Sequence, residues 1–181
     1  MKVFINPGHM PRQDSGAVSP RTGLQECDVA LSVGKLTKGY LEAAGCECRL
    51  LQADSLWEVT RESNNWEADV FISLHCNAVE DTSANGAECW HFYASREGKK
   101  LSQCIQSQLV DSLPLTDRGV KPAKPGENGL FVLTNTDAIA SLVEMAFISN
   151  EEDEQILRVH QNELARAIAR GVTDYELMRE W

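Results

Sequence analysis

The sequence has 181 residues and a formal net charge of −10, because 17 lysines and arginines face 27 aspartates and glutamates. This length suggests one domain with a substantial core, and the acidic excess argues against a protein that neutralises nucleic-acid phosphates with a basic face. A content of 43% hydrophobic and 24% charged residues is typical of a folded chain and excludes global disorder.

Membrane association and export are not indicated either. The charge disfavours attachment to an anionic membrane surface, and no apolar run approaches the roughly 18 residues of a membrane span. The N-terminus lacks the apolar core of a signal peptide. We therefore expect no membrane insertion and a chain that stays in the cytosol unless something else exports it.

The first half of the chain alternates between strand and helix patterns. Short apolar runs predict buried strands, and apolar residues at helical spacing predict helices. The expected elements are a strand over residues 2–6, a helix over 25–44, a strand over 46–51, a helix over 56–67 and a strand over 69–75.

The second half continues the alternation after the turn at Asn85-Gly86. We expect a strand over 88–94, a helix over 97–112, a loop over 114–129, strands over 130–133 and 141–147, and one long helix over 151–178. Strands alternating with helices predict a layered α/β domain with a mostly parallel sheet, in which reactive groups gather at the carboxyl ends of strands.

That rule selects four residues. His9 follows the first strand in a Pro-Gly-His turn, and His75 ends the strand over 69–75. Glu144 lies in an apolar run, where an unpaired carboxylate is costly, and Glu26 opens the first long helix. Taken singly, a turn histidine is usually a surface residue, and a glutamate in a first helical turn usually complements the helix dipole.

Taken together, these residues suggest a metal centre. Two imidazoles and one carboxylate form a three-ligand zinc set with a fourth position for water, and a second carboxylate beside that water suits a general base. The spacing matches no compact metal-binding motif, so spacing alone is weak support.

Other reactive residue types are assigned no chemistry. The six cysteines are spaced unlike a disulfide framework and are expected to be reduced, buried thiols. His91 and His160 are interpreted as structural and surface residues, respectively. Core packing is the commoner use of a tryptophan, although the four tryptophans could also stack on sugar.

Seven ordered segments carry a resemblance to a known family. They are INPGH at residues 5–9, DSGA at 14–17, GLQECDVAL at 23–31, ADVFISLHCNA at 68–78, GAE at 86–88, RGVK at 118–121 and LVEMAFISN at 142–150. With these segments, nearly the whole chain resembles the catalytic domain of the zinc-dependent N-acetylmuramoyl-L-alanine amidases, which degrade bacterial peptidoglycan.

The resemblance implies a mixed, mostly parallel sheet flanked by helices on both faces, in a single catalytic domain over residues 1–181 without a separate wall-binding domain. It implies one Zn²⁺ per chain held by His9, Glu26 and His75, with Glu144 as the catalytic carboxylate. The implied substrate is peptidoglycan, cut at the amide between the lactyl group of N-acetylmuramic acid and L-alanine. A bare catalytic domain resembles an endolysin, which implies a protein that is cytoplasmic until release and then acts on the cell wall. A housekeeping or sporulation amidase without its signal is the alternative.

The chain departs from the family pattern at several positions. Asn6 replaces the commoner aspartate, Met10-Pro11 replaces a glycine pair, Thr134 stands where many members have arginine, and Ala146 replaces a glycine. These changes leave the expected ligands and base in place but bear on substrate contacts. Two other functions stay open: a zinc peptidase cutting within the stem peptide, and a non-catalytic wall-binding relative.

Overall fold

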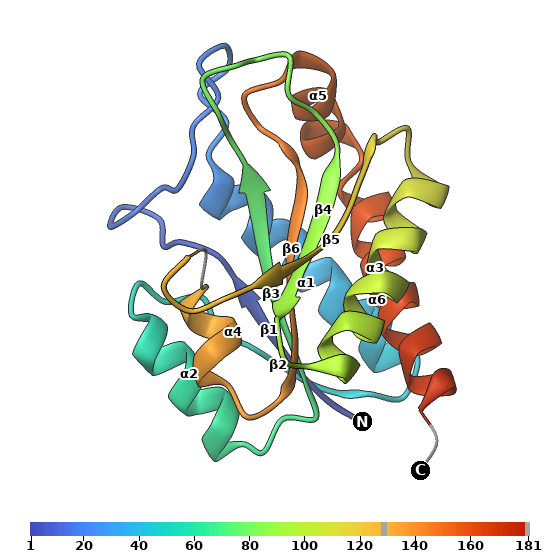
Figure 1. The fold of residues 1–181 in the computed structure, drawn as a ribbon. Coiled ribbons are helices and arrows are strands. Elements are labelled where there is room, and N and C mark those ends of the chain that lie inside the picture. Colours follow the sequence, from blue (N-terminus) through green and yellow to red (C-terminus); the bar gives the residue numbers. More distant parts are fainter. Residues whose placement is uncertain (128–129, 180–181) are drawn as a thin grey trace.

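The fold is built on one six-stranded sheet, seen here in a computed structural model that describes residues 1–127 and 130–179 (Figure 1). The strands are β1 (Lys2–Pro7), β2 (Glu47–Leu50), β3 (Val70–Asn77), β4 (Ala87–Phe92), β5 (Asp117–Ala123) and β6 (Ile139–Phe147). Their order is β2-β1-β3-β6-β4-β5, and only the pairing of β4 with β6 is antiparallel. The expected mixed, mostly parallel sheet is confirmed.

Helices cover both faces of the sheet, also as expected. They are α1 (Glu26–Ala43), α2 (Leu56–Asn65), α3 (Arg96–Ser112), α4 (Phe131–Asn135), α5 (Glu151–Val159) and α6 (Gln161–Met178). Figure 1 shows α2 and α4 together on one side of the sheet, with α3 and α6 on the other.

Alternation along the strands divides the core between the two faces. Val3, Ile5 and Ile72 pack with apolar residues of α1, α3 and α6, whereas Phe4 and Phe71 point to the opposite face. There they pack with residues of the α2 and α4 region. Because successive strand side chains point to opposite faces, continuous apolar runs give a sheet buried on both sides.

Three expected elements are wrong in part. Residues 130–133 do not form a strand, since α4 begins at Phe131 and buries the adjacent Val132 and Leu133 together, which a strand would send to opposite faces. The expected loop over 114–129 contains β5, an edge strand that accommodates Pro122 because it pairs only with β4.

The expected helix over residues 151–178 is two helices. His160, with φ −112° and ψ 28°, separates α5 from α6. Neither proline nor glycine marks the break, and the apolar pattern continues across it because both helices contribute to the same core cluster. Among the residues that the structure describes, no helix has the length and apolarity to cross a membrane.

Candidate functional site

Three of the four predicted site residues meet at the carboxyl edge of the sheet. His9 follows β1, His75 lies near the end of β3, and Glu26 is the first residue of α1. One potential ligand atom from each residue lies within 4.8 Å of those of the other two. The convergence follows from topology, because β1 and β3 are parallel neighbours and the loop after β1 returns to the same edge to begin α1.

The carboxylate of Glu26 is the centre of this cluster. Its Oε1 lies 2.9 Å from Nδ1 of His75 and accepts a hydrogen bond from the backbone N–H of Cys76, at 3.0 Å. Its Oε2 lies 3.3 Å from Nε2 of His9 and accepts from the backbone N–H of Ala17, at 2.8 Å. Burial alone raises the pKa of Glu26, but the hydrogen bonds from His75 and His9 lower it well below its usual range. Glu26 is therefore a buried, ionised carboxylate.

The remaining ring nitrogens are held by a second layer of polar groups. Nδ1 of His9 lies 2.7 Å from Oδ2 of Asp14, and Nε2 of His75 lies 3.1 Å from Oγ of Ser73. The Ser73 hydroxyl in turn donates to Oδ1 of Asn6, at 2.9 Å. Such partners fix the orientation and tautomer of ligating imidazoles.

None of these three supporting residues was assigned a role from the sequence. Asp14 lies in a family segment, and Ser73 shares a strand face with His75, but neither spacing identifies its partner. Asn6 was noted only as a departure from the family pattern. Its buried side chain also donates to the carbonyl of Leu51 and so helps to shape this edge.

Two glycines let the cluster close up. A Cβ atom on Gly8 would lie 2.3 Å from the His75 ring. Gly16 has φ +65°, and a Cβ there would lie 2.5 Å from Oε2 of Glu26 and 2.6 Å from the His9 ring. Glycine is therefore required at both positions by close approach, and at Gly16 also by backbone conformation.

The charge of the cluster suits a bound cation. The hydrogen bond with Glu26 raises the pKa of His9 to about 9, although burial lowers it. Asp14 also raises this pKa. The site thus favours positive charge between an ionised carboxylate and two imidazoles. Two nitrogen donors and one oxygen donor with supported rings form a potential metal site of the kind that Zn²⁺ accepts.

The fourth predicted residue, Glu144, lies directly beside this cluster. It pairs in register with His75 of β3 and with Glu88 of β4, so three neighbouring strands align these side chains on one sheet face. Within the described residues, its buried Oε2 atom has no hydrogen-bond partner. Burial raises the pKa of Glu144 to about 7, opposed by His75 and assisted by the charge of Glu26. A carboxyl group with this pKa suits proton transfer near neutral pH.

Glu88 has the opposite environment and was missed as a site residue. It accepts hydrogen bonds from Nε of Arg118, at 2.8 Å, and Nε1 of Trp90, at 3.1 Å, and it is also paired with Lys121. Burial alone raises its pKa, but Lys121 and Arg118 lower it. The sequence signal that could have identified Glu88 is the one that identified Glu144, namely a carboxylate within an otherwise apolar strand.

The remaining sequence interpretations are settled at the side-chain level. His91 is buried with Nδ1 2.8 Å from the carbonyl of Phe92, and His160 is exposed, so both lie outside the cluster. All six cysteines are free, but the expectation of buried thiols is wrong for Cys48 and Cys104, which are only half-buried. Trp66 packs in the core as expected, Trp57 is exposed, and Trp181 lies outside the described residues.

None of the other departures from the family pattern is a member of the cluster. Met10 forms a backbone bridge with Asp14, which brings that carboxylate back to His9. Thr134 is exposed in α4 and donates to the carbonyl of Phe131, at 3.0 Å, whereas Ala146 is buried in the core.

Comparison with known proteins identifies relatives over almost the whole chain. Residues 3–174 match the family model described as N-acetylmuramoyl-L-alanine amidase. The N-acetylmuramoyl-L-alanine amidase LytC of Bacillus subtilis is 35% identical over 96% of this chain, which spans only 35% of the length of LytC.

Solved structures agree with the match. The N-acetylmuramoyl-L-alanine amidase AmiC2 of Nostoc punctiforme superposes with a TM-score of 0.89 at 30% identity, covering 99% of this chain and 98% of its own. An N-acetylmuramoyl-L-alanine amidase from Clostridium difficile 630 gives 0.87 at 29% identity, with the same coverage of both chains.

Proposed function

The chain belongs to the N-acetylmuramoyl-L-alanine amidase family, and from this premise we propose that it is a zinc-dependent hydrolase acting on peptidoglycan. The bond cut is the amide between the lactyl group of N-acetylmuramic acid and L-alanine of the stem peptide. The observation that carries the proposal is the His9–Glu26–His75 cluster with Glu144 in register beside it. Because peptidoglycan forms the bacterial cell wall, the protein acts there in this proposal.

In this proposal His9, Glu26 and His75 hold one Zn²⁺. When bound, the ion supplies a Lewis acid that polarises the lactyl carbonyl and lowers the pKa of water. The buried negative charge of Glu26 and the partners Asp14 and Ser73 support this assignment, because they orient the donors before the ion arrives. Cys76, the thiol next to His75, takes no part, since burial raises its pKa well above the usual value.

Glu144 acts as the general base and then as the general acid. Its ionised form accepts the proton of the attacking water, and its protonated form returns that proton to the departing amine of L-alanine. A pKa of about 7 makes both forms accessible near neutral pH. Glu88 is unsuited to this task, because Arg118 and Lys121 hold it in the ionised form.

Product analysis tests the proposed bond directly. The zinc-loaded protein is incubated with a muropeptide of defined structure, and the products are identified by mass spectrometry. The proposal predicts an intact stem peptide with a free N-terminal L-alanine and a glycan without peptide. Fragments cut within the stem peptide would instead identify a peptidase, and an unchanged substrate would identify a non-catalytic relative.

A further inference from the structure

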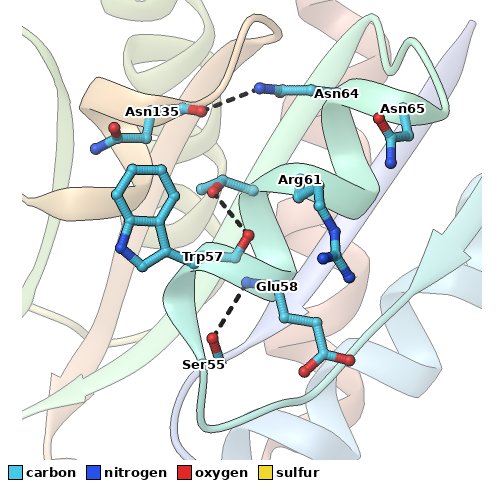
Figure 2. Close-up of a pocket in the computed structure, with 8 residues that line it drawn as sticks. Ser55, Trp57, Glu58, Arg61, Asn64, Asn65 and Asn135 are labelled. Carbon is cyan, nitrogen blue, oxygen red and sulfur yellow. Dashed lines mark hydrogen bonds between the residues drawn. The ribbon is translucent and has the colours of Figure 1, made fainter.

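A hollow separate from the metal cluster lies over α2 and beside α4 (Figure 2). It has a volume of about 680 Å³ and is lined mainly by α2, with Asn135 contributed by α4 (Figure 2). Neither the metal cluster nor Glu144 lines it. We propose that this hollow, hereafter the Trp57 pocket, binds an N-acetylated sugar ring of the glycan strand, a subsite that rests on the proposed function.

The exposed indole of Trp57 is the first reason. Trp57 is 69% exposed, although a folded protein is normally stabilised when a tryptophan side chain is buried. The ring contacts Phe131 of α4 edge to face, with centroids 4.9 Å apart and an interplanar angle of 70°. An aromatic platform that is already held in place loses little freedom when a ligand stacks on it.

The polar groups that line the same hollow are the second reason. Glu58 and Asn65 have no side-chain hydrogen-bond partner within residues 1–127 and 130–179, whereas Asn64 is engaged with α4, donating to the carbonyl of Asn135 at 3.1 Å. A hollow lined both by an aromatic face and by uncommitted amide and carboxylate groups matches a sugar, which has an apolar C–H face and a rim of hydroxyl and acetamido groups.

Charge favours the glycan over the stem peptide as the occupant. The pocket is lined by one acidic and one basic side chain, Glu58 and Arg61, so its own charge is balanced. Stem peptides carry carboxylates, and the chain as a whole has a net charge of −10. The acidic chain would repel the carboxylates of a stem peptide, whereas a neutral N-acetylglucosamine unit experiences no such repulsion.

The Trp57 pocket is also connected to the metal cluster. The side-chain amide of Gln52 donates to the carbonyls of Gly8, at 3.4 Å, and Cys27, at 2.9 Å, which are the neighbours of His9 and Glu26 in the chain. The pocket begins at Ser55, three residues later, a span of at most about 11 Å. The end of the pocket at Ser55 therefore lies near the segments that carry His9 and Glu26, as a polymer bound at both places requires.

Binding of chitotetraose, measured by isothermal titration calorimetry, tests the proposal. This N-acetylglucosamine tetramer has the glycan linkage but no stem peptide, so the amidase reaction cannot consume it. We expect the wild-type protein to bind it in the millimolar range or tighter and Trp57→Ala to weaken binding by about fivefold or more, the cost of one aromatic contact. Trp57→Tyr, which keeps a ring, should retain most of the affinity.

The matched control is Leu56→Ala, which removes an exposed apolar side chain from the same helix without changing the pocket lining. It should bind like the wild type. Absence of binding to the wild type, equal binding by Trp57→Ala, or an equal loss in Leu56→Ala would overturn the subsite. Cleavage of an N-acetylmuramoyl dipeptide by the wild type is measured in parallel, and its failure would contradict the proposed function while leaving the binding result to decide the subsite.

Discussion

Two glutamates beside each other have opposite environments, which supports the two different roles that we propose for them. Glu26 accepts hydrogen bonds from the imidazoles and from two backbone N–H groups, whereas Glu144 has a buried oxygen without a partner among the described residues. The pKa of Glu26 is accordingly lowered and that of Glu144 raised to about 7. Both residues could be selected from the sequence, but their local patterns do not contain these contacts, and the division of roles came from the family resemblance.

The raised pKa of Glu144 predicts a stability cost that depends on pH. The folded value of about 7 exceeds the ordinary 4.5, so the carboxyl group costs nothing below pH 4.5 and its full amount above pH 7. In metal-free protein, Glu144→Gln should therefore raise the free energy of unfolding by about 1–3 kcal/mol at pH 8 and by much less at pH 5. Urea denaturation at the two pH values measures this, and an equal or larger gain at pH 5 would contradict it.

The raised pKa of His9 predicts proton release when the metal binds. With a pKa of about 9, the imidazole of the metal-free protein is protonated at pH 7, whereas a metal ligand must be neutral. Zinc binding at pH 7 should release about one proton from this residue, and the release should decline as the pH rises through 9. Titration calorimetry in buffers of different ionisation enthalpy counts the protons, and release that does not change over this range would contradict the assignment.

At the scale of elements, the turn after β1 and the end of β3 must approach each other closely. Gly8→Ala would place a methyl group 2.3 Å from the His75 ring, so we expect displaced ligands and zinc affinity reduced at least tenfold. Gly39→Ala in α1 is the matched control, since a Cβ there meets nothing within 4 Å and alanine is the better helix former. The zinc affinity of both variants is measured by competition with a chelator. Equal affinities in the two variants would contradict this account.

The elements that the sequence predicted well are those with a strong periodic signal. The apolar runs of β1 and β3 and the helical spacing of α1 and α3 lead directly to their observed positions. The short helix α4 and the edge strand β5 were not predicted, because their stability depends on burial against α2 and pairing with β4. The break at His160 has no local signal at all.

At the scale of the whole molecule, the order of the strands in the sheet brings the residues of the candidate site together. Residues 9, 26, 75 and 144 are far apart in the chain, and they meet because β1, β3 and β6 are adjacent and parallel. The rule for the carboxyl ends of strands predicted the edge of the sheet at which His9, Glu26 and His75 come together. It did not predict Glu88, which lies beside Glu144 on β4, the strand antiparallel to β6. It also did not predict the contacts of Asp14 and Ser73 with the two histidines.

The central claim assigns metal binding to Glu26 and proton transfer to Glu144, and paired measurement of zinc content and amide cleavage in Glu144→Gln and Glu26→Gln tests it most directly. Glu144→Gln keeps the shape of the side chain, so it should retain about one zinc per chain while turnover falls by about 10²–10⁴-fold. Glu26→Gln should lose zinc first and activity as a consequence. Zinc lost from Glu144→Gln but kept by Glu26→Gln would show that the two roles are reversed.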